Sequence, residues 1–164
     1  MSAASTAAEQ ETKFDRVLRS LAEYIPYNRY LGVRFERLGD ELTGRLPFSA
    51  HIVGNPMLPA IHGGVMGAFL EVTAQVQLGW NLASEDLAAQ NEAADQIDRG
   101  VFPRIPKTIN ISIDYLRSAR PRDTFARAEI QKAGRRVVNV HVTAWQDERA
   151  RPVAMLRGNF LMPD

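Results

Sequence analysis

The 164-residue sequence contains no cysteine, which excludes disulfide bonds, thiolate metal sites and a cysteine nucleophile. It also contains no unbroken run of eighteen apolar residues, the length that a transmembrane helix needs. Its first residues, MSAASTAAEQETK, have neither the basic start nor the apolar core of a secretory signal. We therefore expect a cytoplasmic protein with no membrane partner.

An excess of charge of one sign is also missing. Twenty Lys and Arg residues oppose 19 Asp and Glu residues, for a net charge of +1. A nucleic-acid surface would require clustered basic residues with interleaved aromatics, so we expect no nucleic-acid partner. The three histidines do not show the spacing of metal ligands, so we expect no metal site.

The middle of the chain is almost free of charge. Between Arg45 and Glu85 the only formally charged side chain is that of Glu71. Around it, the apolar residues of segment 64–78 are distributed over most of a helical circumference, which predicts a helix covered by protein on nearly every side. Burying a carboxylate costs several kcal/mol unless it is paired or hydrogen-bonded. Glu71 is therefore the first candidate for a functional residue, the alternatives being a water-filled seam or a distant arginine partner.

The start of this predicted helix has the sequence His62-Gly63-Gly64. Two glycines leave backbone N–H groups uncovered at the positive end of the helix dipole, where anions or a developing oxyanion bind. An oxyanion site and a desolvated carboxylate on one helix favour hydrolysis of an acyl group. Burial would also make Glu71 a stronger base, as this chemistry requires.

The remaining pattern predicts a single domain over residues 12–164, preceded by a loose tail over residues 1–11. An amphipathic helix is expected over 12–25, with a capping box at Thr12 and Asp15. A hairpin over 31–37 and 41–48 and an irregular loop over 50–59 should follow. Segment 81–106 is predicted to be an insertion with a short helix beginning at Ser84, acting either as a lid or as surface padding.

Alternating apolar residues predict the strands that complete the domain. Ile109, Ile111, Ile113 and Tyr115 should share one face, and similar patterns follow at 124–131, 138–144 and 153–162. One long apolar helix against an antiparallel sheet is an α+β layer fold.

The motif His62-Gly63-Gly64, with an acid nine residues after the histidine, resembles the acyl-CoA thioesterases of the hot-dog fold. The resemblance is greatest to the phenylacetyl-CoA (PaaI-like) branch of the 4-hydroxybenzoyl-CoA thioesterase superfamily, and it extends to segments 108–117 and 133–136. It implies an antiparallel sheet wrapped around one long central helix. It also implies catalytic roles for Glu71, for the Gly63 N–H, for His62 as an orienting group and for Asn55. This branch usually carries Asp where the present chain has Glu71.

The same resemblance implies an acyl-CoA substrate, with CoA as part of the substrate rather than a cofactor. The candidates for binding the CoA phosphates are four arginines: Arg117, Arg120, Arg135 and Arg136. Gly63 and Glu71 should lie about 12 Å apart along one helix, too far to act on one carbonyl. A homodimer with antiparallel helices, alone or in a dimer of dimers, would bring Gly63 of one chain to Glu71 of the other.

Two further hypotheses come from different classes of function. Segments 51–59 and 71–75 resemble the HFPGxPxxPG and ExxAQ motifs of hot-dog 3-hydroxyacyl-thioester dehydratases, which suggests dehydration with His51 or His62 and Glu71. The third hypothesis is a non-catalytic acyl-CoA-binding module. A binding module gains nothing obvious from a buried acid, so Glu71 argues against it.

Overall fold

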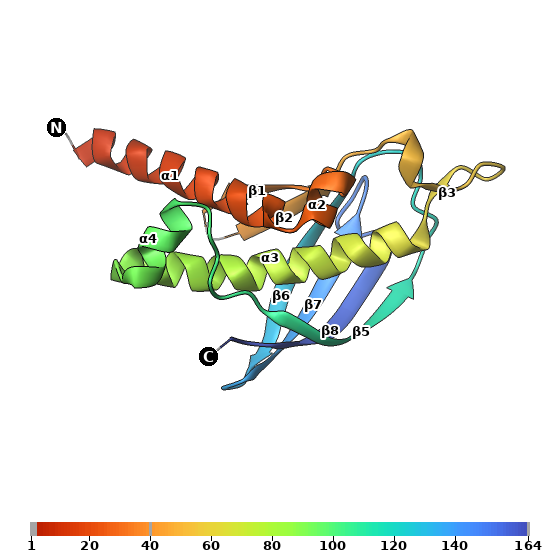
Figure 1. The fold of residues 1–164 in the computed structure, drawn as a ribbon. Helices are drawn as coiled ribbons and strands as arrows, with labels where there is room; N and C mark the ends of the chain where they lie inside the picture. Colours follow the sequence, from red (N-terminus) through yellow and green to blue (C-terminus); the bar gives the residue numbers. More distant parts are fainter. Residues whose placement is uncertain (1–2, 40, 164) are drawn as a thin grey trace.

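The computed structural model describes residues 3–39 and 41–163, in which one long helix crosses a six-stranded antiparallel sheet (Figure 1). The strand order is β1-β2-β6-β7-β8-β5. These strands are β1 (Arg34–Leu38), β2 (Glu41–Leu46), β5 (Lys107–Tyr115), β6 (Thr124–Ala133), β7 (Val137–Trp145) and β8 (Ala154–Leu161). The helices are α1 (Ala3–Tyr24), α2 (Pro26–Leu31), α3 (Gly63–Ala89) and α4 (Glu92–Asp98). A short 3-10 turn, η1 (Ala50–Ile52), and a small hairpin, β3 (Val53–Asn55) and β4 (Ala60–Ile61), lead into α3.

The core lies between α3 and the sheet. Phe69 and Leu70 on α3 are fully buried, as are Val140 and Leu156 on the central strands. Each such side chain contributes about 1.5–3 kcal/mol through its removal from water. Helix α3 contacts five of the six strands, and α1 packs along β1 and α3 (Figure 1). This is the predicted hot-dog arrangement of an antiparallel sheet around one central helix.

The central helix is longer than the sequence pattern predicted. It begins at Gly63 and continues to Ala89, where Gln90 adopts a left-handed conformation. The predicted helix start at Ser84 is therefore wrong, because Ser84 lies inside α3. Asp86 is buried there and paired with Arg104 at 2.8 Å, which ties the connection after α4 to α3. The next helix, α4, is instead capped by Asn91, whose side chain accepts a hydrogen bond from the Ala94 N–H.

The first helix also differs from the predicted range of 12–25. It begins at Ala3, so the residues from 3 to 11 that we predicted to be loose are helical, and Thr12 lies inside the helix rather than at its start. Met1 and Ser2 lie outside the described residues. Pro26 ends α1 and occupies the first turn of α2, where the missing N–H costs nothing. The first strand of the predicted hairpin consequently begins at Arg34, and Asp40 of its predicted turn is not described.

Strand β5 contains an irregularity that the alternating pattern did not predict. Thr108 pairs with Phe160 and Asn110 with Asn159, so Ile109 is an extra residue in a β-bulge. The bulge places Thr108, rather than Ile109, on the same face as Ile111, and Ile109 is 54% exposed. β5 is also an edge of the sheet, since among the described strands it pairs with β8 alone.

No helix within residues 3–39 and 41–163 combines the length and apolarity needed to cross a bilayer.

A carboxylate joins the end of β2 to the start of β6. Asp123 accepts a hydrogen bond from the Phe48 N–H at 2.8 Å and two from the Arg45 guanidinium, the shorter at 2.6 Å. These hydrogen bonds, first that of Phe48 and then that of Arg45, hold the pKa of Asp123 below its ordinary value.

We expect Asp123→Asn to lower the free energy of unfolding by about 1 kcal/mol at pH 7, the size of a partly exposed charge-assisted pair. Because the folded-state pKa is lowered, the carboxylate stabilises the fold above its ordinary pKa near 4, and this stabilisation is lost as the pH falls through the lowered value. Urea unfolding at pH 7 and near pH 3, at one protein concentration, measures this. An equal difference at both pH values would contradict it.

Candidate active site

The N-terminus of α3 is held by backbone hydrogen bonds from two other parts of the chain. The Ile61 N–H donates to the Ala119 carbonyl and the His62 N–H donates to the Ile52 carbonyl, both at 2.8 Å. His62 is the N-cap residue, and its Nδ1 accepts a hydrogen bond from the Gly64 N–H at 2.9 Å. That bond occupies the Nδ1 lone pair, so the His62 side chain caps the start of the helix.

Gly63 is the first residue of α3, and its N–H has no acceptor within the helix. No partner for this N–H is found elsewhere in the described part of the chain. The carbonyl of Gly63 accepts a hydrogen bond from the Tyr115 hydroxyl at 2.8 Å, which fixes the helix start to the end of β5. The Gly63 N–H is thus a positioned donor at the positive end of a 27-residue helix.

Glu71 lies two turns further along α3 and is half-buried. The Thr108 hydroxyl on β5 donates a hydrogen bond to Glu71 Oε1 at 2.6 Å, and Thr108 Oγ1 accepts one from Gln75 Nε2 at 3.1 Å. No Lys or Arg of the described residues forms an ion pair with Glu71. The carboxylate is therefore held by a neutral hydrogen-bonded chain, which rules out the distant-arginine alternative for a single chain.

The close packing of α3 on β5 makes this contact. A Cβ atom on Gly67 would lie 2.9 Å from Ile113 Cδ1, too close for any larger residue without movement. Gly67 lies between the two contacts of helix and strand, Gly63 with Tyr115 and Glu71 with Thr108, and a larger residue there would require the end of the Ile113 side chain to move.

Sequence reasoning did not identify Thr108, Gln75 or Tyr115 as site residues. Gln75 carried a usable signal, because it is the next polar side chain on the same face, four residues after Glu71. Thr108 could not be identified from the sequence, since the orientation of its side chain depends on the bulge at Ile109.

A cavity of about 530 Å³ opens beside the helix start, lined by Gly63, Met66, Tyr115 and Arg117 among others. A second cavity of about 330 Å³ shares Arg117, Ser118 and Val153 with the first and also reaches Arg120 and Arg151. Glu71 is not among the described residues that line either one. Neither of these two cavities therefore brings the donor and the carboxylate together within one chain.

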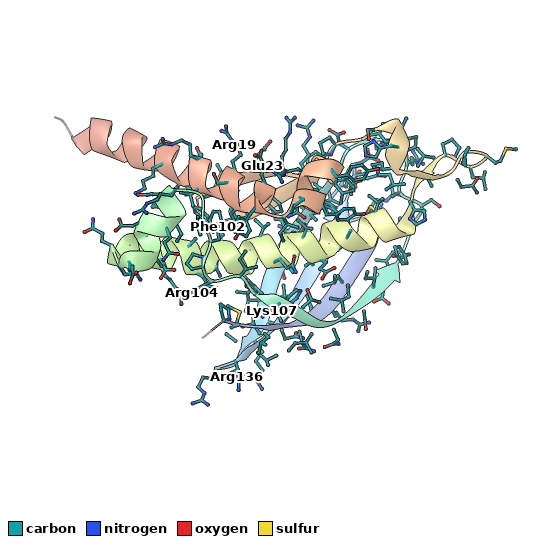
Figure 2. All side chains as sticks on the ribbon, in the orientation of Figure 1. Arg19, Glu23, Phe102, Arg104, Lys107 and Arg136 are labelled. Atoms are coloured by element: carbon teal, nitrogen blue, oxygen red, sulfur yellow. The ribbon has the colours of Figure 1, made fainter. Side chains whose placement is uncertain are left out.

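The four candidate arginines fall into two separate groups. Arg117 and Arg120 line the cavities beside the start of α3. Arg135 and Arg136 lie in the β6–β7 turn, and Figure 2 shows Arg136 at the end of the sheet away from that helix start. The structure thus does not bring all four together in one chain.

Asn55 lies in the β3–β4 hairpin, whose loop projects beyond the start of α3 (Figure 1). Its Oδ1 accepts hydrogen bonds from the Met57 N–H at 2.9 Å and the Leu58 N–H at 3.3 Å. In a single chain this side chain therefore closes its own loop and makes no described contact with Glu71. Across residues 3–39 and 41–163, no group of three or more His, Asp or Glu side chains could hold a metal ion.

The fold and this site define a hot-dog enzyme with a hydrogen-bonded acid and a helix N-terminal donor. Residues 58–153 match the family described as the thioesterase superfamily. The chain belongs to this superfamily and is a thioester hydrolase. The family assignment favours hydrolysis over the dehydration that segments 51–59 and 71–75 suggested.

The chain is also similar to individual relatives and solved structures. The chain is 31% identical over 152 residues to the medium/long-chain acyl-CoA thioesterase YigI of Escherichia coli K12, covering 91% of this chain and 92% of the relative. A crystal structure of a Chromobacterium violaceum protein is similar at 32% identity with a TM-score of 0.65, covering 94% and 96% of the two chains. The E. coli PaaI protein of the phenylacetic acid degradation operon shares the fold, with a TM-score of 0.68 at 13% identity over 93% and 95%.

We expect Thr108→Val to lower kcat by roughly tenfold, because it removes a hydrogen bond to a charged acceptor and releases the Glu71 side chain. Thr108→Ser keeps the hydroxyl and should retain most of the activity. Steady-state kinetics of the purified variants, with thermal unfolding as the check on folding, measure this. Equal loss in Ser and Val variants would show that the methyl group, not the hydroxyl, matters.

Proposed function

We propose that the protein is an acyl-CoA thioesterase in which Glu71 is the catalytic acid side chain. The observation that carries the proposal is the 2.6 Å hydrogen bond from the Thr108 hydroxyl to a half-buried carboxylate that forms no ion pair within the described residues. The similarity to YigI, whose name specifies medium- and long-chain acyl-CoA, supports this substrate class.

The chemistry follows from these groups. Glu71 removes a proton from water as the water attacks the thioester carbonyl, or it attacks the carbonyl itself and water hydrolyses the resulting anhydride. The carbonyl oxygen becomes an oxyanion that accepts a hydrogen bond from a Gly63 N–H. The C–S bond then breaks, and the thiolate of CoA leaves and takes up a proton.

The nucleotide of CoA requires positive charge near the helix start. Arg117 is a candidate because it lines the cavity beside Gly63, and Arg120 is a candidate because it lines the neighbouring cavity, which Asp147 and Glu148 also line. Arg151 lines the same cavity as Arg120 and was not among the arginines that the sequence analysis proposed for CoA. We place the CoA phosphates on this side, while Arg135 and Arg136 lie elsewhere in the same chain.

Glu71→Gln tests the proposal directly. It preserves side-chain shape and removes the base or nucleophile, so kcat on an acyl-CoA should fall by at least about a hundredfold. Release of free CoA thiol from a panel of aliphatic and aromatic acyl-CoAs is the measurement, and crotonyl-CoA should not gain water. Near-normal turnover by the folded variant, or hydration without thiol release, would refute the proposal.

We propose further that the site is shared between two chains, and the length of the helix supports this. Gly63 and Glu71 are separated by about 12 Å along α3, and a reacting carbonyl needs both within about 3 Å. The free edge of β5 allows a second chain to pair there, and a two-fold axis makes the two α3 helices antiparallel. The Gly63 N–H of one chain then meets Glu71 of the other.

Co-expression of Glu71→Gln with Gly63→Pro tests the shared site. Proline is tolerated in the first helical turn, and His62 already has the extended backbone that a residue before proline prefers. Each homodimer should be inactive, whereas each mixed dimer contains one intact site, so random assortment restores about a quarter of wild-type activity. If purified mixed dimers of folded chains stay inactive, both groups must act within one chain.

A further inference from the structure

The start of α3 combines the proposed oxyanion donor with two consecutive glycines, Gly63 and Gly64. Glycine loses more conformational freedom on folding than any other residue, so a helix that begins with two of them is flexible at its start. An oxyanion donor is effective only when its direction is fixed before the reaction begins. The Gly63 N–H therefore needs restraints that the two glycines do not provide.

The peptide unit between Gly63 and Gly64 is restrained at both of its ends. Its carbonyl oxygen, on Gly63, accepts the hydrogen bond of 2.8 Å from the Tyr115 hydroxyl. Its N–H, on Gly64, donates the hydrogen bond of 2.9 Å to His62 Nδ1. The preceding peptide unit is held at the His62 carbonyl, which accepts a hydrogen bond from the Met66 N–H at 3.1 Å. Its other end is the Gly63 N–H, whose direction these three hydrogen bonds determine.

The imidazole that binds the Gly64 N–H lies between two glycines. A Cβ atom on Gly54 would lie 2.7 Å from His62 Cα and 3.0 Å from both Cβ and Cδ2 of the same residue. A Cβ atom on Gly64 would lie 3.0 Å from His62 Nδ1 and 3.1 Å from its Cε1. The two glycines thus border the ring at its Cδ2 and at its Nδ1–Cε1 side, which restricts its rotation away from the Gly64 N–H.

Gly54 is required by space and not by its backbone conformation. Its φ lies outside the left-handed region that favours glycine. The atom nearest to an added Cβ is the Cα of His62, which no change of side-chain rotamer can move. The His62 N–H is also fixed, since it donates to the Ile52 carbonyl at 2.8 Å. An alanine at position 54 would therefore displace the backbone at which the helix begins.

We propose that Gly54 and Tyr115 are positioning residues for thioester hydrolysis, because they hold the peptide unit between Gly63 and Gly64. Gly54 acts through the His62 imidazole, and Tyr115 acts through its hydroxyl. This inference rests on the oxyanion role proposed above for the Gly63 N–H and adds to it the residues that fix the direction of that N–H. Disturbing either residue should slow the chemical step and leave the binding of CoA unchanged.

Gly54→Ala is the first variant to test. Restoring an ordinary contact moves the two backbones apart by at least about 0.7 Å, the difference between 2.7 Å and 3.4 Å. A misplacement of about 1 Å costs about a hundredfold in rate, so we expect kcat to fall by between about tenfold and about a hundredfold. The Kd of an S-alkyl-CoA thioether, which has no carbonyl, should stay within about twofold of the wild-type value.

Gly79→Ala is the matched control on the same helix. An added Cβ at Gly79 would lie 3.4 Å from the Leu21 methyl groups, which is an ordinary contact. This variant should keep the wild-type kcat. Thermal unfolding shows whether each variant is folded.

Tyr115→Phe removes the hydrogen bond at the other end of the same peptide unit and keeps the ring. We expect kcat to fall by about fivefold with an unchanged thioether Kd. Tyr30→Phe on α2, where the ring is 63% exposed, is the control and should keep the wild-type kcat. Because both variants loosen one peptide unit, adding Tyr115→Phe to Gly54→Ala should lower kcat by less than about twofold further.

Nitrogen NMR of the imidazole tests the arrangement without any substrate. Because Nδ1 accepts the Gly64 N–H, the neutral His62 ring carries its proton on Nε2. At pH 8 the wild type should show this tautomer for His62, whose signals are assigned by their loss in His62→Gln. In Gly54→Ala the two nitrogen signals should move toward each other, as expected for a mixture of tautomers.

An unchanged His62 tautomer in Gly54→Ala, a loss of thioether affinity equal to the loss of kcat, or additive effects in the double variant would overturn the inference. If Gly54→Ala does not fold, Tyr115→Phe decides, and a wild-type kcat in that variant would overturn the inference. A folded Gly63→Pro protein with normal turnover would instead count against the proposed oxyanion role, while the NMR result would still report on the contact of Gly54 with His62.

Discussion

The structure depends on burying one long, nearly uncharged helix against an antiparallel sheet. Phe69, Leu70 and Leu78 of α3 are almost fully removed from water by the strands. A charged side chain on such a helix is tolerated only at the margin of the contact, where a strand can donate a hydrogen bond to it. Glu71 occupies that margin, beside the edge strand β5, and Thr108 provides the bond.

The bulge at Ile109 determines which side chains of β5 face α3, and so which one can donate a hydrogen bond to Glu71. Without it, the alternation of β5 would turn Ile109 toward the helix and Thr108 away from it. With it, the strand presents a hydroxyl to Glu71 at one end and the Tyr115 hydroxyl to the helix start at the other. A single irregularity thus determines what lies next to the acid.

The features of this structure that could be predicted from the sequence are those that depend on local residue patterns. The long apolar segment, its glycine start and the alternating strands predicted the helix and the sheet, and they placed Glu71 on that helix. The ends of the helices were harder to predict from the sequence. Asp86 is of a residue type that is common at the start of a helix, but it is buried inside α3 through its tertiary pairing with Arg104. The contact of Thr108 with Glu71 was not predictable, since the apolar alternation fits β5 equally well with or without a bulge. Sequence also could not show that Arg117 and Arg120 lie apart from Arg136, because spatial clustering is a property of the fold (Figure 2).

An exposed edge strand is ordinarily a hazard, because its unpaired backbone groups and apolar side chains invite association. β5 carries Ile109 and Tyr115 at more than half exposure, with no proline in the strand. In the proposed dimer this edge is paired with its own copy. The pairing satisfies the backbone, covers these side chains and supplies the oxyanion donor that Glu71 lacks in its own chain. Stability and catalysis would then both require the same pairing register of β5. A slip in that register that exposed the apolar face of the strand would also separate the two halves of each active site.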